Sequence, residues 1–596
     1  MRKCLWLCAI LCLFLVAGSR AYGQSAIPAS FFGFQVNHNC DITSTGVPGV
    51  GCPGNPAGEF GFPGLPFAWS RSQGASDGAD GGLKWNNMVQ CDPTGTACPI
   101  SGSRCSKDGL TTGGNPCPTA ELSTTCTNPS LIAPDDPTNC AYVWPLFDFY
   151  TNLYNSKSVG WMYAVYYTPD YLSIRGSRCT GHHTATFGTD NTCLAVADGP
   201  PTASPDCTPK PGYGCDPPYD VDSVPGNGDG AGTDQNLINF MTALMAHMAA
   251  NSQHFESISI WNEMNVCGEW HHTSCDASAY GTPDQLVRMT NDVRTIAVGA
   301  QPSIKMVSGG IFGVGNFNTY LKPILSKEAA SGFQFDYVGF HDYYHPGGQS
   351  CGGSGGCPVP EEWLAQWAEL KAILTTYGLT SIDSEFSWGE HANVVNSDMR
   401  EAQTARSYIL QEQMYPTVLA VNWFGEDYAM KAGGGSGEFW SPGPSGTDNC
   451  VVADPVQGGF DCPAGLAYQQ TVAWTEGATF SPGSGTNPCT CDDSIDGNCS
   501  ATPKKGTFSC TITRPSPSGY SAVLVWDNTN TTFPCSGYST VREQQACGTT
   551  LYSIPAAYQT STSLWVDLDN DTPISLSGVT STHVGAKPVL IENMSY

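Results

Sequence analysis

Eight short apolar runs recur along the chain, and amphipathic helical patterns separate several of them. Most of these runs are nearly continuous in apolar residues, which is typical of strands buried on both faces of a parallel sheet. Eight such strands alternating with helices predict an α/β fold of the (β/α)8 type, a TIM barrel. The predicted strands are Phe31–Asn37, Phe67–Ser72, Val159–Thr168, Ser257–Asn262, Ile304–Gly309, Phe335–Tyr343, Thr380–Glu385 and Val418–Phe424.

Three helices are predicted between these runs. The first covers Leu237–Met248, where apolar residues share one face. The second begins at Thr282, because Thr282 can cap a helix, Pro283 suits the first helical position and Gln285 completes a capping box. The third covers Pro360–Tyr377, and a glycine follows it, as is common after the last turn of a helix.

The pattern changes near Thr502 to shorter alternating segments with turn residues between them. This pattern predicts a C-terminal antiparallel β-sandwich over residues 501–596, after a barrel that covers residues 24–500. Two stretches of the barrel region, about residues 91–140 and 174–232, are rich in Cys, Gly, Pro and Thr and show no strand or helix period. We interpret them as disulfide-rich loop insertions.

The first 23 residues have the pattern of a secretory signal peptide. Arg2 and Lys3 precede an apolar stretch from Leu5 to Val16, and the small residues Ala21 and Gly23 follow it. This apolar stretch is too short to span a membrane, and no other run reaches that length. We therefore expect a secreted or periplasmic protein without a membrane anchor.

The cysteine count agrees with export. Of the 27 cysteines, three lie in the predicted signal, so 24 remain, an even number that predicts disulfides in an oxidising compartment. Zinc binding would favour CxxC pairs, whereas Cys489 and Cys491 form only a CxC. The turn segments Asn227–Gly230 and Asp492–Gly497 are acidic but lack the glutamate of an EF-hand, so both are predicted to be plain turns. No metal site is predicted.

The charge excludes one large class of partners. With 25 basic and 53 acidic side chains the formal net charge is -28, which repels phosphate backbones, so no nucleic-acid partner is expected. The sequence contains no phosphate-binding glycine loop, no Rossmann fingerprint and no Ser-His-Asp order. No cofactor is therefore predicted.

Two glutamates stand at the ends of predicted barrel strands. Glu263 follows the fourth strand, and Glu385 ends the seventh. Catalytic residues of TIM barrels lie at the carboxyl ends of the strands, and these two strands can project their end residues toward one another. Cleavage of a glycosidic bond with retention of configuration needs such a pair, one acid and one nucleophile, about 5–5.5 Å apart.

The two segments resemble a known group of enzymes. WNEMN, residues 261–265, looks like the WNEPN signature of the retaining glycoside hydrolases of clan A, and SEFSWG, from Ser384, resembles their nucleophile segment. The motif order is most similar to glycoside hydrolase family 39 and its relatives, which include β-xylosidases. Further similar segments are SRSQG, YYTPDYLS, GFHDYY, VNWFGEDY, GLAYQQTVAW and AKPVLIEN.

The resemblance implies a set of site residues. Glu263 would be the acid/base and Glu385 the nucleophile, while Asn262 would hold the sugar 2-hydroxyl. The other implied residues are Arg71, which would keep the nucleophile ionised, His341 and Tyr343, which would contact the sugar or the nucleophile, and Trp423, which would form an aromatic floor under a sugar.

Alternative interpretations remain open for several of these residues. Arg71 could form a structural ion pair, and His341 and Trp423 could belong to the core. Asp383 is a rival nucleophile, because it lies two residues before Glu385 and therefore faces the same side of a regular strand. Two residues depart from the family pattern, since Met264 replaces a proline and Ser384 a threonine.

Cysteines also follow the strands that carry the site. Cys267 and Cys275 come shortly after Glu263, and Cys351 and Cys357 bracket a glycine-rich run after the sixth strand. We expect two local disulfides here. The first would fix a loop with Trp270 and His271, which could line a subsite for the leaving group.

The sequence thus predicts a secreted retaining glycosidase that hydrolyses O-glycosyl bonds of a poly- or oligosaccharide, with a β-xylosidase-like or related activity. A catalytically inactive carbohydrate-binding protein on the same scaffold is the first alternative. A structural exported protein held by disulfides is the second.

Overall fold

The computed structural model describes the parts of the chain that form the barrel, its helices and the C-terminal sheets. The described residues are 25–35, 64–72, 85, 144–166, 168, 186–187, 193–194, 217–218, 220–224, 227–263, 265, 282–312, 317–332, 335–343, 360–387, 397–425, 439–441, 450–481, 489–494, 497–500, 504–517, 519–529, 534–569 and 573–594. The predicted signal peptide, the insertion at 91–140, most of the second insertion and the pairs Cys267/Cys275 and Cys351/Cys357 lie outside these residues, as do Trp270 and His271.

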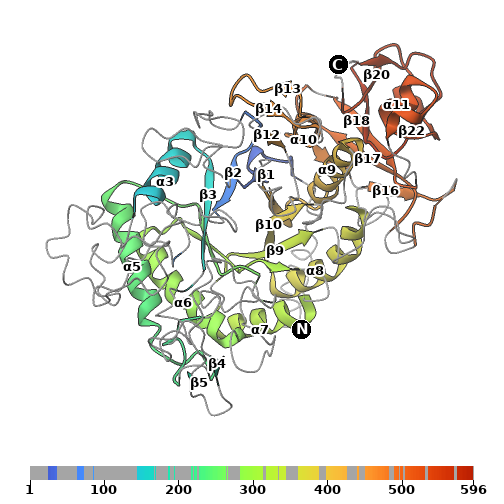
Figure 1. Ribbon diagram of the computed structural model, residues 1–596. Helices are drawn as coiled ribbons and strands as arrows, with labels where there is room; N and C mark the ends of the chain where they lie inside the picture. The colour runs from blue at the N-terminus through green and yellow to red at the C-terminus, as the bar shows by residue number, and fades with distance from the viewer. Residues whose placement is uncertain are drawn as a thin grey trace, which may run out of the picture.

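Eight parallel strands close into a barrel at the centre of the molecule (Figure 1). All eight predicted strands are present; seven are shorter than predicted, and the seventh, β10, extends two residues beyond its predicted end. β10 closes the barrel by pairing with both β9 and β11. The (β/α)8 prediction is therefore confirmed. The barrel strands are β1 (Phe32–Phe34), β2 (Trp69–Ser72), β3 (Gly160–Val165), β6 (Ser257–Ile260), β7 (Lys305–Val307), β9 (Tyr337–Tyr343), β10 (Thr380–Ser387) and β11 (Val418–Trp423).

Helices surround the barrel and cover its outer face (Figure 1). The capping box predicted at Thr282 is present, because Gln285 N–H donates to the Thr282 hydroxyl while the Gln285 side chain accepts from Thr282 N–H. Gly378 follows the last turn of its helix with φ 68°, which a glycine adopts without strain. The helices are α3 (Pro145–Lys157), α5 (Gln235–Ala250), α6 (Pro283–Ala300), α7 (Lys322–Ser331), α8 (Trp363–Tyr377), α9 (Ser397–Glu412) and α10 (Pro463–Thr475).

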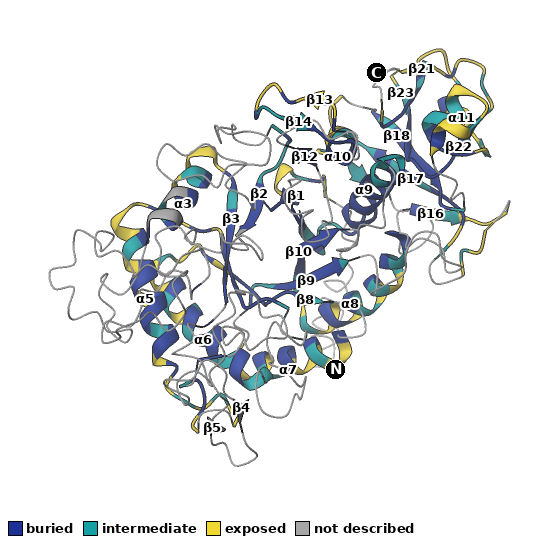
Figure 2. Cartoon of the chain, viewed as in Figure 1, coloured by how far each residue is buried: buried dark blue, intermediate teal, exposed yellow. Residues whose placement is uncertain are grey.

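The main core lies between the barrel and these helices, where Figure 2 shows the inward helix faces buried. Aromatic side chains fill much of it; Tyr163 of β3, for example, stacks on Phe255 with ring centroids 5.0 Å apart. A smaller apolar cluster, formed by Trp69, Met162, Val307, Ile382 and Ala420, comes from five barrel strands. The apolar runs thus pack on both faces, as expected of a barrel.

Short strands are added to the barrel in the loops. β8 (Ile311–Phe312) extends the sheet beside β9. β12 (Trp440–Ser441), β13 (Val452–Ala453) and β14 (Phe460–Asp461) form a small antiparallel sheet after the last barrel strand, and the disulfide Cys450–Cys462 ties it. β4 (Thr186–Phe187) and β5 (Cys193–Leu194) form a two-stranded sheet inside the second predicted insertion.

The C-terminal part is β-rich, as predicted. Its seven-stranded sheet takes in β15 and β16, which precede residue 501, and a two-stranded sheet (β19 and β22) and the helix α11 (Val541–Ala546) accompany it. The larger sheet contains β15 (Thr479–Phe480), β16 (Cys489–Asp492), β17 (Thr507–Thr513), β18 (Ser521–Asp527), β20 (Ser563–Val566), β21 (Ile574–Ser575) and β23 (Val589–Asn593); the smaller one contains β19 (Thr550–Ser553) and β22 (Ser581–Val584).

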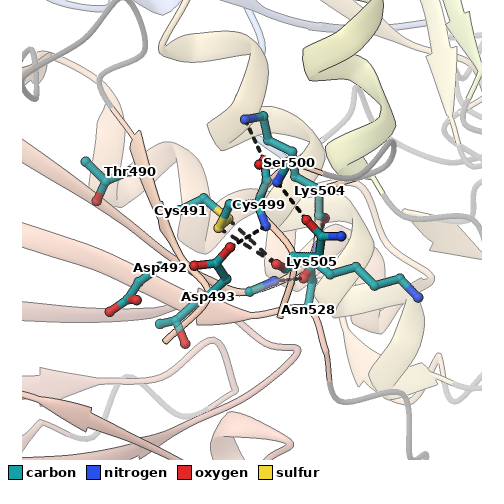
Figure 3. Close-up of a disulfide and its surroundings, with 12 residues drawn as sticks. Thr490, Cys491, Asp492, Asp493, Cys499, Ser500, Lys504, Lys505 and Asn528 are labelled. Atoms are coloured by element: carbon teal, nitrogen blue, oxygen red, sulfur yellow. Dashed lines mark hydrogen bonds between the residues drawn. A yellow bond between two sulfur atoms is a disulfide. The ribbon is translucent and has the colours of Figure 1, made fainter. Parts of the chain in front are cut away.

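The CxC segment forms two separate disulfides. Cys489 of β16 bonds to Cys510 on the neighbouring strand β17, and Cys491 bonds to Cys499 (Figure 3). A further disulfide joins Cys535 to Cys547. In the acidic turn between Cys491 and Cys499, the Asp493 carboxylate accepts from Cys499 N–H at 3.1 Å, so the turn is held by its own hydrogen bonds.

Buried charges join the β-rich part to the barrel. Arg406 of α9 forms a buried ion pair with Glu361, and the indole N–H of Trp526 on β18 donates to the same carboxylate at 2.7 Å. Lys587, which is 2% exposed, contacts Asp569 and also two carboxylates of α9, Asp398 and Glu401. These contacts fix α9 between the two parts.

The described residues contain no helix that is both long and apolar enough to cross a membrane.

We predict that Lys587→Met destabilises the protein strongly. Removing the cation leaves the carboxylates of Asp398, Glu401 and Asp569 close together without compensation, which typically costs about 3–5 kcal/mol of unfolding free energy. Urea unfolding measures the change. The control is Lys305→Met, because Lys305 is 47% exposed and lies 3.5 Å from Asp336; a surface pair contributes about 1 kcal/mol or less. Equal losses in the two variants would contradict the prediction.

Candidate active site

Six of the seven predicted site residues meet at the carboxyl ends of four barrel strands. Arg71 lies on β2, Asn262 and Glu263 directly follow β6, His341 and Tyr343 lie on β9, and Glu385 lies on β10. The hydrogen bonds described next join all six into one network. The seventh residue, Trp423, lies elsewhere.

Arg71 is the centre of this network and is 1% exposed. Its Nη1 donates to Glu385 Oε2 at 2.6 Å, and its Nη2 donates to the side-chain oxygen Oδ1 of Asn262 at 2.7 Å. Nη1 also lies 3.3 Å from His341 Nε2. A buried cation needs such partners, because desolvating an uncompensated charge is costly. Arg71 therefore forms an ion pair, and its partner is the predicted nucleophile.

His341 connects the two glutamates. Its Nδ1 lies 2.8 Å from Glu263 Oε1 and 3.8 Å from Glu385 Oε2. One ligand atom from each of these three residues lies within 4.8 Å of the other two. The Tyr343 hydroxyl donates a short hydrogen bond to the other oxygen of Glu385. The two carboxylates thus stand close together, each held by a neighbouring side chain.

A β-bulge sets the direction of Glu385. Asp383 pairs with Phe340 of β9, whereas Glu385 pairs with His341, so two steps along β10 correspond to one step along β9. A bulge of this kind re-aims the side chains that follow it. Glu385 consequently faces the site beside His341, and Asp383 lies level with Phe340, whose ring stacks on Trp363 of the helical layer.

Asp383 therefore does not face the same side as Glu385, and the expectation from regular alternation was wrong. Its Oδ2 accepts from the amide of Gln411 on α9 at 2.7 Å. Burial, together with the nearby Asp342, raises the pKa of Asp383 well above its ordinary value. A buried carboxyl bonded to the surrounding helix lies away from the strand ends where Glu385 stands, so the geometry argues against Asp383 as the nucleophile.

Trp423 also faces the helical layer. It is 0% exposed, and its ring stacks on Phe439 at 4.9 Å and lies edge-on to Phe386 at 5.0 Å. The ring of Tyr408 on α9 also stacks on it, with ring centroids 6.1 Å apart. A fully buried indole offers no face to a sugar, so the core interpretation replaces the predicted aromatic floor.

The backbone after β6 is strained. Trp261 has φ 70° and Glu263 has φ 37°, both in the left-handed region that residues other than glycine rarely adopt. Such a backbone conformation costs about 1–3 kcal/mol of folding free energy, and it persists where the surrounding structure holds it, most often at functional sites. Hydrogen bonds at both ends hold this turn: Trp261 N–H donates to the Val165 carbonyl, and Asn265 bonds to the loop after β7.

The protonation of the site follows from burial and from Arg71. Burial, with a smaller contribution from the positive charge of Arg71, lowers the pKa of His341 to about 3 against the opposing effect of Glu385. His341 is therefore a neutral imidazole near neutral pH. Burial raises the pKa of Glu385 above 4.5, while Arg71 and the Tyr343 hydrogen bond act against this rise.

Glu263, His341 and Glu385 are also the kinds of ligand that a divalent metal binds, and they are close enough to do so. Arg71, however, already places a positive charge 2.6 Å from Glu385 and 3.3 Å from His341. That charge compensates the carboxylate and opposes a second cation. The arrangement suits acid, base and nucleophile chemistry better than metal binding.

Sequence reasoning missed two residues of the site. Gly310 lies so close to His341 that a Cβ atom on it would stand 1.9 Å from Nε2, so only glycine fits there. Asn265 donates to the Phe312 carbonyl at 2.6 Å and accepts from Phe312 N–H at 2.9 Å. Asn265 is the last residue of the WNEMN segment, and Gly310 ends a Gly-Gly pair after the fifth strand; both signals are visible in the sequence.

No protein-family model matches the chain, and no curated protein matches it either. Solved structures do match its fold. A conserved exported protein from Bacteroides fragilis aligns with a TM-score of 0.50 and 10% identity over 96% of this chain and 98% of that one. A family 39 glycoside hydrolase from Bacteroides cellulosilyticus gives 0.45 and 13% over 76% and 71%. A monomeric β-xylosidase from Caulobacter crescentus gives 0.42 and 13% over 76% and 84%.

At these identities the likeness is one of fold. The closed barrel agrees with the fold that the resemblance to the clan A glycoside hydrolases implied.

We predict that His341 stays neutral well below the pH at which histidine normally titrates. Nitrogen NMR of the imidazole, assigned with a His341→Asn variant, should show no protonation at about pH 5, because the pKa lies near 3 instead of 6.5. The same residue should titrate near 6.5 when the protein is unfolded in urea. A folded-state midpoint above about pH 6 would contradict the burial and the Arg71 contact described above.

Proposed function

We propose that this protein is a secreted glycosidase that hydrolyses O-glycosyl bonds of a poly- or oligosaccharide by a retaining, double-displacement mechanism. Glu385 is the nucleophile and Glu263 the acid/base. The observation that carries the proposal is the network around Arg71, in which two carboxylates of different surroundings face one another across His341.

The spacing of the carboxylates supports retention. An oxygen of Glu263 and an oxygen of Glu385 lie within 4.8 Å of each other. Retaining glycosidases hold their carboxyl groups about 5–5.5 Å apart, whereas inverting enzymes separate them by about 6.5–9.5 Å to admit a water molecule. The short spacing is nearer to the separation in retaining enzymes than to that in inverting ones.

The surroundings suit the two roles. Glu385 is bonded to Arg71 and to the Tyr343 hydroxyl, and both contacts favour its ionised form, which attacks the anomeric carbon. The Glu263 side chain is 15% exposed against 5% for Glu385, so Glu263 has the better access to the leaving group and to water. Glu263 first donates its proton to the glycosidic oxygen, and it then accepts a proton from the water that cleaves the glycosyl ester.

Asn262 binds the sugar in this proposal. Its side-chain amide oxygen accepts from Arg71 Nη2, so the amide NH2 is the group that would contact the sugar 2-hydroxyl, as the clan resemblance implies. Such a contact strengthens as the transition state forms and so raises the rate.

Export is part of the proposal. The four described disulfides (Cys450–Cys462, Cys489–Cys510, Cys491–Cys499 and Cys535–Cys547) suit an oxidising compartment, as does the predicted signal peptide.

The proposed substrate class is a plant- or microbe-derived glycan with xylose-like sugars as the first to test. A panel of aryl glycosides identifies the sugar.

We predict that the two glutamates respond differently to substitution. Glu385→Ala should lose essentially all turnover, because no glycosyl ester can form. Glu263→Ala should regain turnover on activated aryl glycosides when azide is added, because azide needs no general base and such aglycones need no acid. Mass mapping after trapping with a 2-fluoroglycoside should place the sugar on Glu385.

Asp383→Asn is the control, because Asp383 bonds to Gln411 of α9. In this variant the trapped sugar should still be found on Glu385. A label on Asp383, or normal turnover by Glu385→Ala, would refute the assignment. A protein that binds sugars but forms no ester and turns over no aryl glycoside would be the inactive carbohydrate-binding alternative.

We predict that Tyr343→Phe moves the acid limb of the pH profile. The limb of kcat/KM at low pH reports ionisation of Glu385, whose pKa is raised by burial. The Tyr343 hydrogen bond lowers that pKa, so its loss raises the pKa and shifts the limb to higher pH. The basic limb, which reports Glu263, should move less. An acid limb that shifts to lower pH would contradict the role of Glu385.

A further inference from the structure

Asn265 forms a two-bond clamp between the turn that carries Glu263 and the strand β8. Its amide donates to the Phe312 carbonyl at 2.6 Å and accepts from Phe312 N–H at 2.9 Å. Both backbone groups of Phe312 are thus bonded to one side chain. The pairing imitates a strand ladder across 47 residues of sequence.

The strand at the other end of the clamp lies against the partners of both glutamates. In the register of β8 on β9, Phe312 is opposite His341, the residue bonded to Glu263. The Phe312 ring lies 5.8 Å from the ring of Tyr343, the residue bonded to Glu385. The backbone just before β8, at Gly310, packs directly on the His341 ring.

These contacts close a ring. It runs from Glu263 to Asn265 along the chain, across the clamp to β8, from β8 to β9 by strand pairing, and from His341 back to Glu263. The turn inside this ring has left-handed backbone at Trp261 and Glu263, a conformation that needs support from its surroundings. The clamp supplies that support on the C-terminal side of Glu263.

We propose that Asn265 is a positioning residue, which holds the Glu263 carboxyl at the distance from His341 and Glu385 that proton transfer to the leaving group requires. This proposal rests on the proposed function and adds a residue to it. Asn265 touches neither the substrate nor the reacting atoms; it acts through the turn that carries the acid.

The consequence is specific to the acid step. Formation of the glycosyl ester joins Glu385 to the anomeric carbon and breaks the bond to the leaving oxygen, which takes the proton of Glu263. A poor leaving group needs that proton, whereas a dinitrophenolate leaves without it. A misplaced Glu263 therefore lowers kcat/KM, which reports ester formation, for the first kind of substrate and not for the second, while general damage to the fold lowers it for both.

The test compares phenyl and 2,4-dinitrophenyl β-D-xyloside, or the same aglycones on the sugar that the substrate panel selects. Asn265→Ala should lower kcat/KM for the phenyl glycoside roughly 100-fold, the scale of a misplacement of about 1 Å. It should lower kcat/KM for the dinitrophenyl glycoside less than about 3-fold, which also shows that the variant is folded. Azide should raise its kcat on the dinitrophenyl substrate, because misplaced Glu263 is a poor base.

Asn265→Asp is the second variant. It keeps the bond from Phe312 N–H, but its carboxylate oxygen repels the Phe312 carbonyl oxygen, so one of the two bonds of the clamp is lost. Its ratio of phenyl to dinitrophenyl kcat/KM should fall below that of the wild type. This variant keeps the test open if Asn265→Ala does not fold.

Asn528 is the matched control. In the β-rich part it makes the same kind of clamp, donating to the Lys504 carbonyl at 2.8 Å and accepting from Gly506 N–H at 2.8 Å (Figure 3). Asn528→Ala should lower the melting temperature and leave the ratio of the two substrates unchanged.

The outcomes separate the two proposals. Equal losses on both substrates in the Asn265 variants, or no loss on either, would overturn the positioning role while Glu385 labelling and azide rescue of Glu263→Ala still hold. Failure of those two experiments would overturn the proposed function itself, whatever Asn265 does.

Discussion

The buried charge of Arg71 is the constraint on which the rest of the site depends. A guanidinium that is 1% exposed must be compensated, and its partners come from strands that are distant in the sequence. Glu385 compensates the charge, and Asn262 and His341 complete the contacts of the guanidinium. One cation at the strand ends thereby fixes the positions of β2, β6, β9 and β10 relative to each other. The geometry of the two glutamates follows from that arrangement.

Much of the fold was predictable from the sequence, because the relevant signals are local. Apolar runs located all eight strands, and the capping box at Thr282 located the start of α6. Site residues that belong to a recognisable sequence motif were predictable. Glu263, Glu385 and Arg71 meet as the resemblance implied, and their catalytic roles are predictions.

The remaining features depend on contacts that no local pattern encodes. The bulge between Asp383 and Glu385 breaks the alternation on which the rival nucleophile was predicted. Whether Trp423 faces a substrate or the core is decided by Tyr408 and Phe439, which approach it from other elements. The Asn265 clamp joins two loops whose closeness is a result of barrel closure, so it becomes visible only in three dimensions.

The position of α9 has a consequence for how such a protein can evolve. One side of this helix bonds, through Gln411, to Asp383 of β10, and two of its carboxylates, Asp398 and Glu401, pair with Lys587 of the β-rich part. Domains that recombine between genes are joined by exposed, flexible linkers that few contacts cross. Here the two parts are joined by buried ion pairs, so exchanging either part would leave buried charges of the other part without their partners. The barrel and its β-rich partner are therefore expected to be inherited together, as a single evolutionary unit.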